Sequence, residues 1–186
     1  MSRRVLWATL ALSLLVTLAL YAVRLAPLES VLTARGHGIV ALELAGTGPR
    51  FTAVMNDWGV EGVAAARAPT RWDFLWIPAY ATVLWAALQL AARSATGRLR
   101  RTGVRLATLV PVAAAADVVE NVALLTALRG SFVHVLAPLA TLAALVKFAI
   151  LLAGLAVIVG ALVRVSARGA GSPRGWATTG PWTRRP

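Results

Sequence analysis

Four long apolar runs dominate the pattern of hydrophobic and polar positions along this chain. They cover Val5–Val23, Phe74–Ala92, Leu106–Leu128 and Val135–Val163. A helix needs about 20 mostly apolar residues to cross a bilayer. Because these runs are continuous rather than alternating, they favour helices over the strands of a barrel. The sequence therefore predicts four membrane-spanning helices, at about residues 5–26, 72–93, 105–128 and 135–164.

The first run follows Arg3 and Arg4, as the core of a secretory signal peptide would. A signal-peptide core has about 7–15 apolar residues, whereas this run has 19. It ends at Tyr21 and Arg24 without a small-residue cleavage site. We therefore expect an uncleaved first helix.

The segment 27–71 joins the first two predicted helices and has an amphipathic pattern of its own. Pro49 suits the first turn of a helix, and Gly59 interrupts that helix ten residues later. Four apolar side chains between them share one helical face at spacings i, i+3, i+4 and i+7: Phe51, Val54, Met55 and Trp58. We expect two or three short amphipathic helices that either cover the ends of the bundle or cap a site open to the outer leaflet.

The predicted fold is thus all-α: a four-helix transmembrane bundle with short amphipathic helices in the outer loop between helices one and two. Residues 1–165 form this single domain, with the outer cap at 27–71. Residues 166–186 are rich in Gly, Pro, Arg and Thr and lack an apolar face. We expect them to form a disordered cytoplasmic tail.

Composition and charge agree with a membrane protein and set its orientation. The chain is 59% hydrophobic and 14% charged, with a net charge of +12, whereas soluble domains are about 25% charged. Twelve basic residues and no acid fall before the first run, between the second and third, and after the fourth. The positive-inside rule then places both termini in the cytoplasm and the chain in the inner membrane. Because topology and anionic lipid head groups account for the arginines, membrane lipids are expected partners and nucleic acid is not.

Five polar side chains within the apolar runs are the most informative feature of the sequence. Asp117, Glu120 and Asn121 lie at i, i+3 and i+4 and so share one helical face. At about 1.5 Å per residue, Tyr80 in the second run and Lys147 in the fourth reach a similar depth. We name this set the polar layer: Tyr80, Asp117, Glu120, Asn121 and Lys147. Glu43 and Asp73 are expected above it, at the outer mouth.

The polar layer has three interpretations. It can fix the register of the helices through buried hydrogen bonds and ion pairs. It can bind a ligand, because ionisable groups inside a membrane commonly mark functional sites. It can also catalyse a reaction, with Asp117 or Glu120 as the candidate catalytic acid or base.

Other chemistry receives little support. The chain has no cysteine and two histidines, which excludes disulfides, thiol catalysis and cysteine-bound metals. His37 and His134 have no metal-ligand spacing between them. We expect no metal site and no cofactor.

Three short motifs resemble a group of small, functionally uncharacterised bacterial four-helix integral membrane proteins. They are Glu43-Leu-Ala-Gly-Thr47, Asp73-Phe-Leu-Trp-Ile-Pro-Ala-Tyr80 and Asp117-x-x-Glu120-Asn121. The resemblance covers about residues 1–163 and implies the four-helix fold. That group has no established activity, so the resemblance implies no catalytic residue.

The sequence favours an integral inner-membrane protein that binds a lipid-like ligand or a membrane protein partner through the polar layer. One alternative is a membrane-embedded enzyme that acts on a lipid or isoprenoid through carboxylate acid/base residues. Another is a small accessory subunit of a membrane complex. The balance of these observations leans away from an enzyme.

Overall fold

The structure is a computed structural model that describes residues 1–170, and its regular structure there is entirely helical. A single π-helical turn, Tyr21–Leu25, connects the first two helices. The helices are α1 (Arg3–Leu20), α2 (Ala26–Thr33), α3 (Ile39–Glu43), α4 (Gly48–Ser94), α5 (Gly97–Ala127) and α6 (Val133–Ala170).

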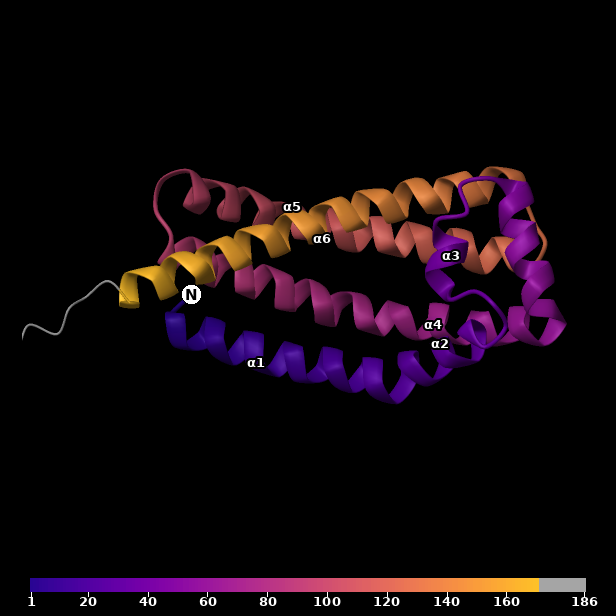
Figure 1. Ribbon diagram of the computed structural model, residues 1–186, viewed down its shortest axis with the longest axis horizontal. Helices are drawn as coiled ribbons and strands as arrows, with labels where there is room; N and C mark the ends of the chain where they lie inside the picture. Colours follow the sequence, from indigo (N-terminus) through magenta and orange to yellow (C-terminus); the bar gives the residue numbers. More distant parts are fainter. Residues whose placement is uncertain (171–186) are drawn as a thin grey trace, which may run out of the picture.

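Four stretches of helix are long and apolar enough to cross a membrane: Arg3–Thr33, Gly48–Ser94, Gly97–Ala127 and Val133–Ala167. Consecutive long helices run in opposite directions along the bundle, so α1 begins and α6 ends at the same end of the molecule (Figure 1). The expected all-α, four-helix bundle is confirmed. The chain is a multi-pass membrane protein.

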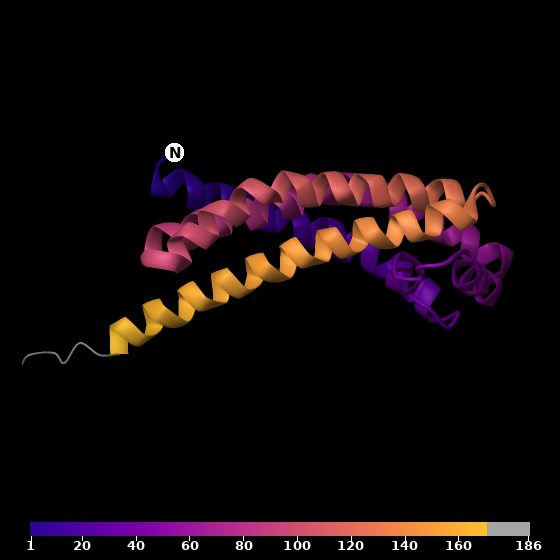
Figure 2. The same cartoon turned by 90° about the horizontal axis from the view of Figure 1, so that it is seen from above.

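The four long helices do not pack equally. α5 lies between α4 and α6 and packs closely on both, whereas α1 packs chiefly on α4. The opposite side of α1 carries exposed leucines such as Leu12 and Leu15, as a lipid-facing surface does. Seen from above, α6 diverges from the other helices toward its carboxyl end (Figure 2). α1 and α6 both pack on α4, whereas no comparable packing between α1 and α6 is found within the described residues.

The cap consists of α2, α3 and the first part of α4, which breaks at Gly59. Gly59 has φ 65°, a left-handed conformation that favours glycine. Of the predicted apolar face, Phe51, Val54 and Trp58 are buried and Met55 is half-buried, while the neighbouring Asn56 and Asp57 are exposed. The short amphipathic helices predicted for the cap are thus confirmed.

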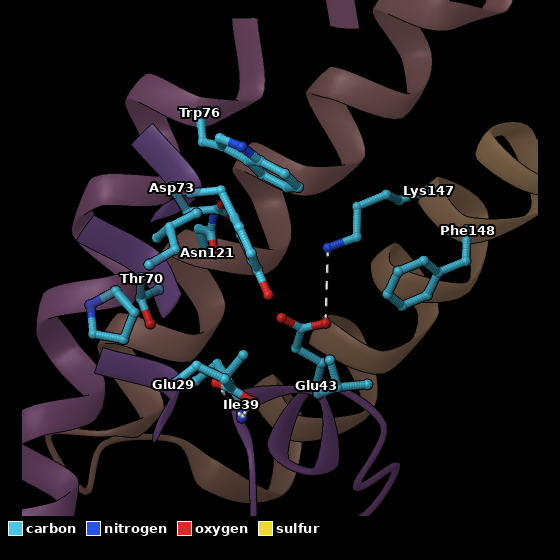
Figure 3. A pocket seen from close by; sticks show the side chains of 13 residues that line it. Glu29, Ile39, Glu43, Thr70, Asp73, Trp76, Asn121, Lys147 and Phe148 are labelled. Atoms are coloured by element: carbon cyan, nitrogen blue, oxygen red, sulfur yellow. Dashed lines mark hydrogen bonds and ion pairs between the residues drawn. The ribbon is translucent and has the colours of Figure 1, made fainter. Parts of the chain in front are cut away.

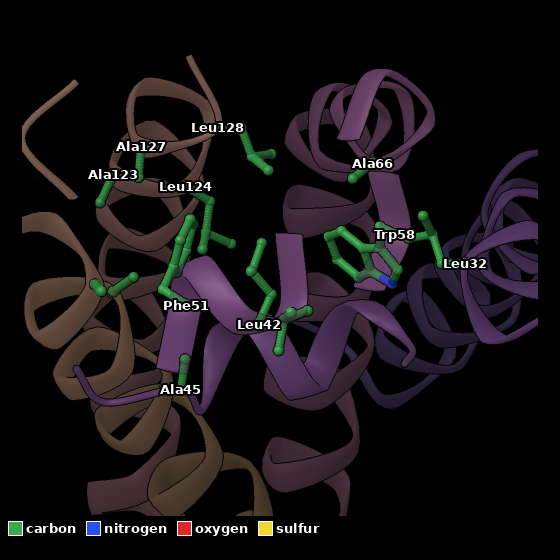
Figure 4. Packing of buried hydrophobic residues seen from close by; sticks show 13 residues of the cluster. Leu32, Leu42, Ala45, Phe51, Trp58, Ala66, Ala123, Leu124, Ala127 and Leu128 are labelled. Atoms are coloured by element: carbon green, nitrogen blue, oxygen red, sulfur yellow. The ribbon is translucent and has the colours of Figure 1, made fainter. Parts of the chain in front are cut away.

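The buried face of the cap packs on the end of the bundle. Phe51 is fully enclosed (0% exposed) in a cluster with Leu124 of α5, Leu128 just after α5 and Leu42 of α3 (Figure 4). Trp58 adds a directed contact, because its Nε1 donates a hydrogen bond to the carbonyl of His37 at 2.7 Å. These contacts dock α3 against the bundle and so position Glu43.

The helices extend beyond the predicted spans. α4 begins at Gly48 rather than near residue 72, and α5 begins at Gly97 rather than near residue 105. The predicted spans end where the first charged residues interrupt the apolar runs. Because Arg and Leu are good helix formers, the helices can continue past those residues. α6 continues to Ala170, so the first residues of the predicted tail are helical. The rest of that predicted tail, 171–186, lies outside the described residues.

Candidate functional site

The polar layer is assembled from three long helices. α4 contributes Tyr80, α5 contributes the face of Asp117, Glu120 and Asn121, and α6 contributes Lys147. Asp117, Glu120, Asn121 and Lys147 are buried in the bundle, and Tyr80 is 8% exposed. The face of α5 that carries the acids therefore points inward, as the cost of charges in lipid requires.

Lys147 lies at the centre of the layer. Its Nζ donates a hydrogen bond to Asp117 Oδ1 at 3.0 Å and forms an ion pair with Glu120 Oε2 at 2.8 Å. A third carboxylate, Glu43 of α3, approaches the same Nζ at 3.8 Å. One ammonium group thus serves three acids, and the layer carries more acid than base.

Asp117 has a partner for each carboxylate oxygen. Tyr80 donates its hydroxyl hydrogen to Oδ2 at 2.6 Å, while Lys147 occupies Oδ1. Glu120 differs, because it is fully enclosed (0% exposed) and its Oε1 has no hydrogen-bond partner among the described residues. An unsatisfied buried carboxylate oxygen is costly, so Glu120 depends on its ion pair with Lys147 for its place in the bundle.

Glu43 and Asp73, expected at the outer mouth, both line the cavity on the cap side and also contact residues of the layer. Asn121 Nδ2 donates to Asp73 Oδ2 at 2.7 Å, which ties the entrance of α4 to α5. Glu43 is 8% exposed and points at Lys147 from the cap. Burial raises the pKa of the Glu43 carboxyl above its ordinary value, and the charge of Lys147 opposes that rise.

A cavity of about 280 Å³, here named the cap cavity, opens between the cap and the layer. Figure 3 shows Glu43, Asp73 and Lys147 converging on it from different helices. Its walls also include Glu29 of α2 and the rings of Trp76 and Phe148. The cap therefore covers a cavity with charged walls as well as the ends of the helices.

Two further cavities lie along the side of α4 that faces both α1 and α6. The middle cavity, about 340 Å³, is almost wholly apolar but has Tyr80, Asp117 and Lys147 in its wall. It shares Trp76, Lys147 and Phe148 with the cap cavity. The terminal cavity, about 350 Å³, continues toward Arg3 and Trp7. Ala87 and Ile158 line both the middle and the terminal cavity. We name this row of three neighbouring cavities the α4 corridor.

The site also contains two residues that were not predicted from the sequence. Trp76 and Phe148 line both the cap and the middle cavity. Trp76 lies one turn before Tyr80, its ring 5.0 Å from the Tyr80 ring, and its Nε1 donates to the carbonyl of Thr17 in α1. The signal was present in the sequence, because Trp76 shares a helical face with Tyr80 and Phe148 follows Lys147 directly.

The two histidines lie away from the polar layer, His37 between α2 and α3 and His134 at the start of α6. His37 pairs with Asp57 at 2.8 Å on the exposed side of the cap. His134 lies against the backbone at Gly48. Within residues 1–170, no three His, Cys, Asp or Glu side chains gather in a way that could hold a metal ion.

The fold defines a multi-pass helical membrane protein. Its site is a buried cluster of ionisable side chains that borders the apolar middle cavity. No protein-family model matches the chain, and no curated protein or solved structure matches it either.

Proposed function

We propose that this protein binds an amphipathic, lipid-like molecule in the α4 corridor, with the polar head in the cap cavity and one hydrocarbon chain in the middle cavity. The observation that carries this proposal is the shared wall of Trp76, Lys147 and Phe148, which borders a charged cavity on one side and an apolar one on the other. Ligand sites are typically cavities of about 300–1,000 Å³ with mostly apolar walls and a few convergent polar groups. The three cavities of the corridor measure about 280, 340 and 350 Å³. Most of the charged groups line the cap cavity, and the walls of the other two are mostly apolar.

The length of the corridor supports the same occupant. From Trp76 to Ala87 the middle cavity follows about 16 Å of α4, at about 1.5 Å per residue. That is about half of the roughly 30 Å hydrocarbon core of a bilayer. A chain from one leaflet fits this depth while its head lies under the cap.

The packing of the layer argues for binding rather than for a purely structural role. Lys147 is paired, as a structural role requires, but Asp73 and Glu43 line the cap cavity and Asp117 lines the middle one. A layer that only fixed helix register would be closed on all sides. Acids left facing open cavities are suited to contact a ligand.

The enzymatic alternative has less support. Asp117, one of the two candidate acid/base residues, already accepts hydrogen bonds on both oxygens. Glu120, the other, lines neither the cap cavity nor the middle one. A general base must lie within hydrogen-bond reach of the proton it removes, and neither residue offers a free oxygen to a molecule in the corridor.

The charge sorting of the sequence completes the proposal. With the positive end of the chain in the cytoplasm, the cap lies outside and the cap cavity faces the outer leaflet of the inner membrane. A ligand would then enter from that leaflet, between α1 and α6.

The experiment that tests this proposal blocks the corridor with one bulky side chain. Ala87 lines both the middle and the terminal cavity, so Ala87→Phe fills the corridor. Ala115 is exposed on α5, away from the corridor, and Ala115→Phe is the matched control. Each variant is released from membranes into neutral micelles and its retained lipids are measured by native mass spectrometry.

We expect the wild-type chain and Ala115→Phe to retain one amphipathic molecule, and Ala87→Phe to lose it by about tenfold, as for a loss of about 1.4 kcal/mol of binding energy. Equal retention by Ala87→Phe and Ala115→Phe, or no retained molecule in any of the three, would refute the proposal.

A further inference from the structure

The cap cavity has an excess of acid that the protein does not neutralise. Glu29, Glu43 and Asp73 line it, and the ammonium group of Lys147 is its one lining cation among the described residues. That ammonium already contacts Asp117 at 3.0 Å and Glu120 at 2.8 Å. The three acids of the wall are therefore left without an equal positive charge.

The buried Glu120 supports the same conclusion independently. Its carboxylate is fully enclosed, Oε1 has no hydrogen-bond partner among the described residues, and Oε2 is directed at Lys147 in the cavity wall. In a low-dielectric site, a negative charge on Glu120 repels a ligand anion and attracts a ligand cation.

Aromatic rings complete the wall. Tyr21, Trp76 and Phe148 line the cap cavity together with the acids. The Phe148 ring already faces one cation, because Lys147 Nζ lies 4.8 Å from its centroid. Aromatic faces combined with carboxylates are the recognition chemistry of ammonium groups, including quaternary ones.

The hydrogen bonds that Asp73 and Glu29 already make within the protein decide which carboxylate oxygens can contact a ligand ammonium group. Asn121 uses one oxygen of Asp73, Oδ2, and leaves Oδ1 for a ligand. Glu29 holds the first backbone N–H of α3, that of Ile39, with both oxygens at 3.1 and 3.2 Å. A ligand cation would thus be held chiefly between Asp73, Glu43 and the ring of Trp76.

We infer that the ligand of the α4 corridor is a single-chain amphipath whose head is an ammonium group, rather than a lipid with an anionic head. This inference rests on the proposed function and specifies its ligand. Charge complementarity selects the head, and the apolar middle cavity receives the chain. A phosphate group is disfavoured, because the one lining cation among the described residues already contacts three acids.

Three probes with the same chain test this inference on the wild-type protein in neutral micelles: hexadecyltrimethylammonium, hexadecyl phosphate and hexadecanol. Binding is titrated by native mass spectrometry. We expect the ammonium probe to bind at least about tenfold more tightly than the other two, because its positive charge is attracted both to the carboxylates and to the aromatic faces of the wall. Phosphatidylethanolamine, whose ammonium is tethered to a phosphate, should compete poorly.

Variants locate the cation. Asp73→Asn and Glu43→Gln keep the shape of the wall and each remove a carboxyl group that ionises against a bound cation, and either should weaken binding of the ammonium probe about tenfold while leaving hexadecanol unchanged. Glu61→Gln is the matched control, since Glu61 is an exposed acid of the cap paired with Arg35. Equal loss for the ammonium and neutral probes would show damage to the fold rather than loss of charge recognition, and would overturn the assignment of the cation to these acids.

The two proposals fail in different ways. If all three probes bind the wild-type chain equally and Ala87→Phe blocks them all, the corridor binds amphipaths but the inference about the ammonium head is wrong. If the phosphate probe binds best, the inference is also wrong. If none of the probes binds, both the inference and the proposed function are refuted.

Discussion

Replacing Lys147 by methionine tests how the polar layer is held together. The substitution keeps the length and most of the apolar stem of the side chain but removes the ammonium group. That group contacts two fully buried carboxylates, Asp117 at 3.0 Å and Glu120 at 2.8 Å. Removing one partner of a buried ion pair costs about 3–5 kcal/mol, because the other charge stays buried and uncompensated. We expect Lys147→Met to lower the free energy of unfolding by that amount at mildly alkaline pH.

The loss should depend on pH in a defined direction. Without the ammonium group, the folded state is relieved when its carboxylates take up protons, so it binds more protons than the unfolded state. Stability of the variant then rises as the pH falls, by at most about 1.4 kcal/mol per pH unit for each proton taken up. The difference from wild type should therefore be smaller at mildly acidic pH.

Replacing the carboxylates of Asp117 and Glu120 by neutral amides should restore stability to the Lys147→Met variant. In the triple variant Lys147→Met, Asp117→Asn, Glu120→Gln no charge is left unpaired among these three positions. Buried ion clusters can often be replaced by neutral groups at little cost. We expect the triple variant to regain about 2 kcal/mol or more of the loss. Reversible unfolding in mixed micelles, followed by circular dichroism, measures all three proteins. A single variant as stable as wild type at alkaline pH, or a triple variant no better than the single one, would contradict the ion-pair geometry.

The remaining predictions concern orientation, the core of the cap and the charge state of its acid. A cytoplasm-active reporter fused after Arg168 should give signal, and a periplasm-active reporter inserted near Gly48 should do so too. Phe51→Ala should lower the free energy of unfolding by about 3–5 kcal/mol, since the ring is fully enclosed between cap and bundle. Raising the pH should loosen α3, because burial raises the pKa of Glu43 and ionising it against the buried acids opposes docking. A cysteine placed at the buried Ala45 should therefore react faster with a water-soluble maleimide as pH rises, and Glu43→Gln should abolish that change.

Each of these predictions has a control and a contrary result. A periplasmic reporter that works at the tail would overturn the orientation. Phe132→Ala removes the same atoms from an exposed ring and should cost little, so an equal loss would refute the packing of the cap. For the pH effect, a cysteine at the exposed Leu44 corrects for the reactivity of the thiol itself. The effect requires that burial, together with Asp117 and Glu29, outweighs Lys147 and the hydrogen bond to Glu120, both of which lower the pKa of Glu43; a ratio independent of pH would show that it does not.

The sequence predicts the long helices and the polar layer for the same physical reason. Charges are costly in lipid, so an uncharged run marks a span and an acidic face within it must turn inward. A rise of about 1.5 Å per residue then places Tyr80 and Lys147 at the depth of Asp117, and the structure joins these three side chains directly.

The features that the sequence does not predict depend on the tertiary arrangement of the cap. Glu43 reaches Lys147 because α3 folds back over the bundle, and the packing of Leu42 and Trp58 fixes that position. The distance between these segments along the chain gives no measure of their distance in space. The corridor is equally hidden, since it arises where α1 and α6 both pack on α4 but not on each other.

An experimental structure of the protein in a lipid nanodisc would test ligand binding in the corridor most directly. We expect elongated density beside α4 from Trp76 to Ala87, ending in a compact head between Asp73 and Glu43 under the cap. A structure in which α1 and α6 close against each other over α4, leaving no room for a chain beside Trp76, would contradict this proposal.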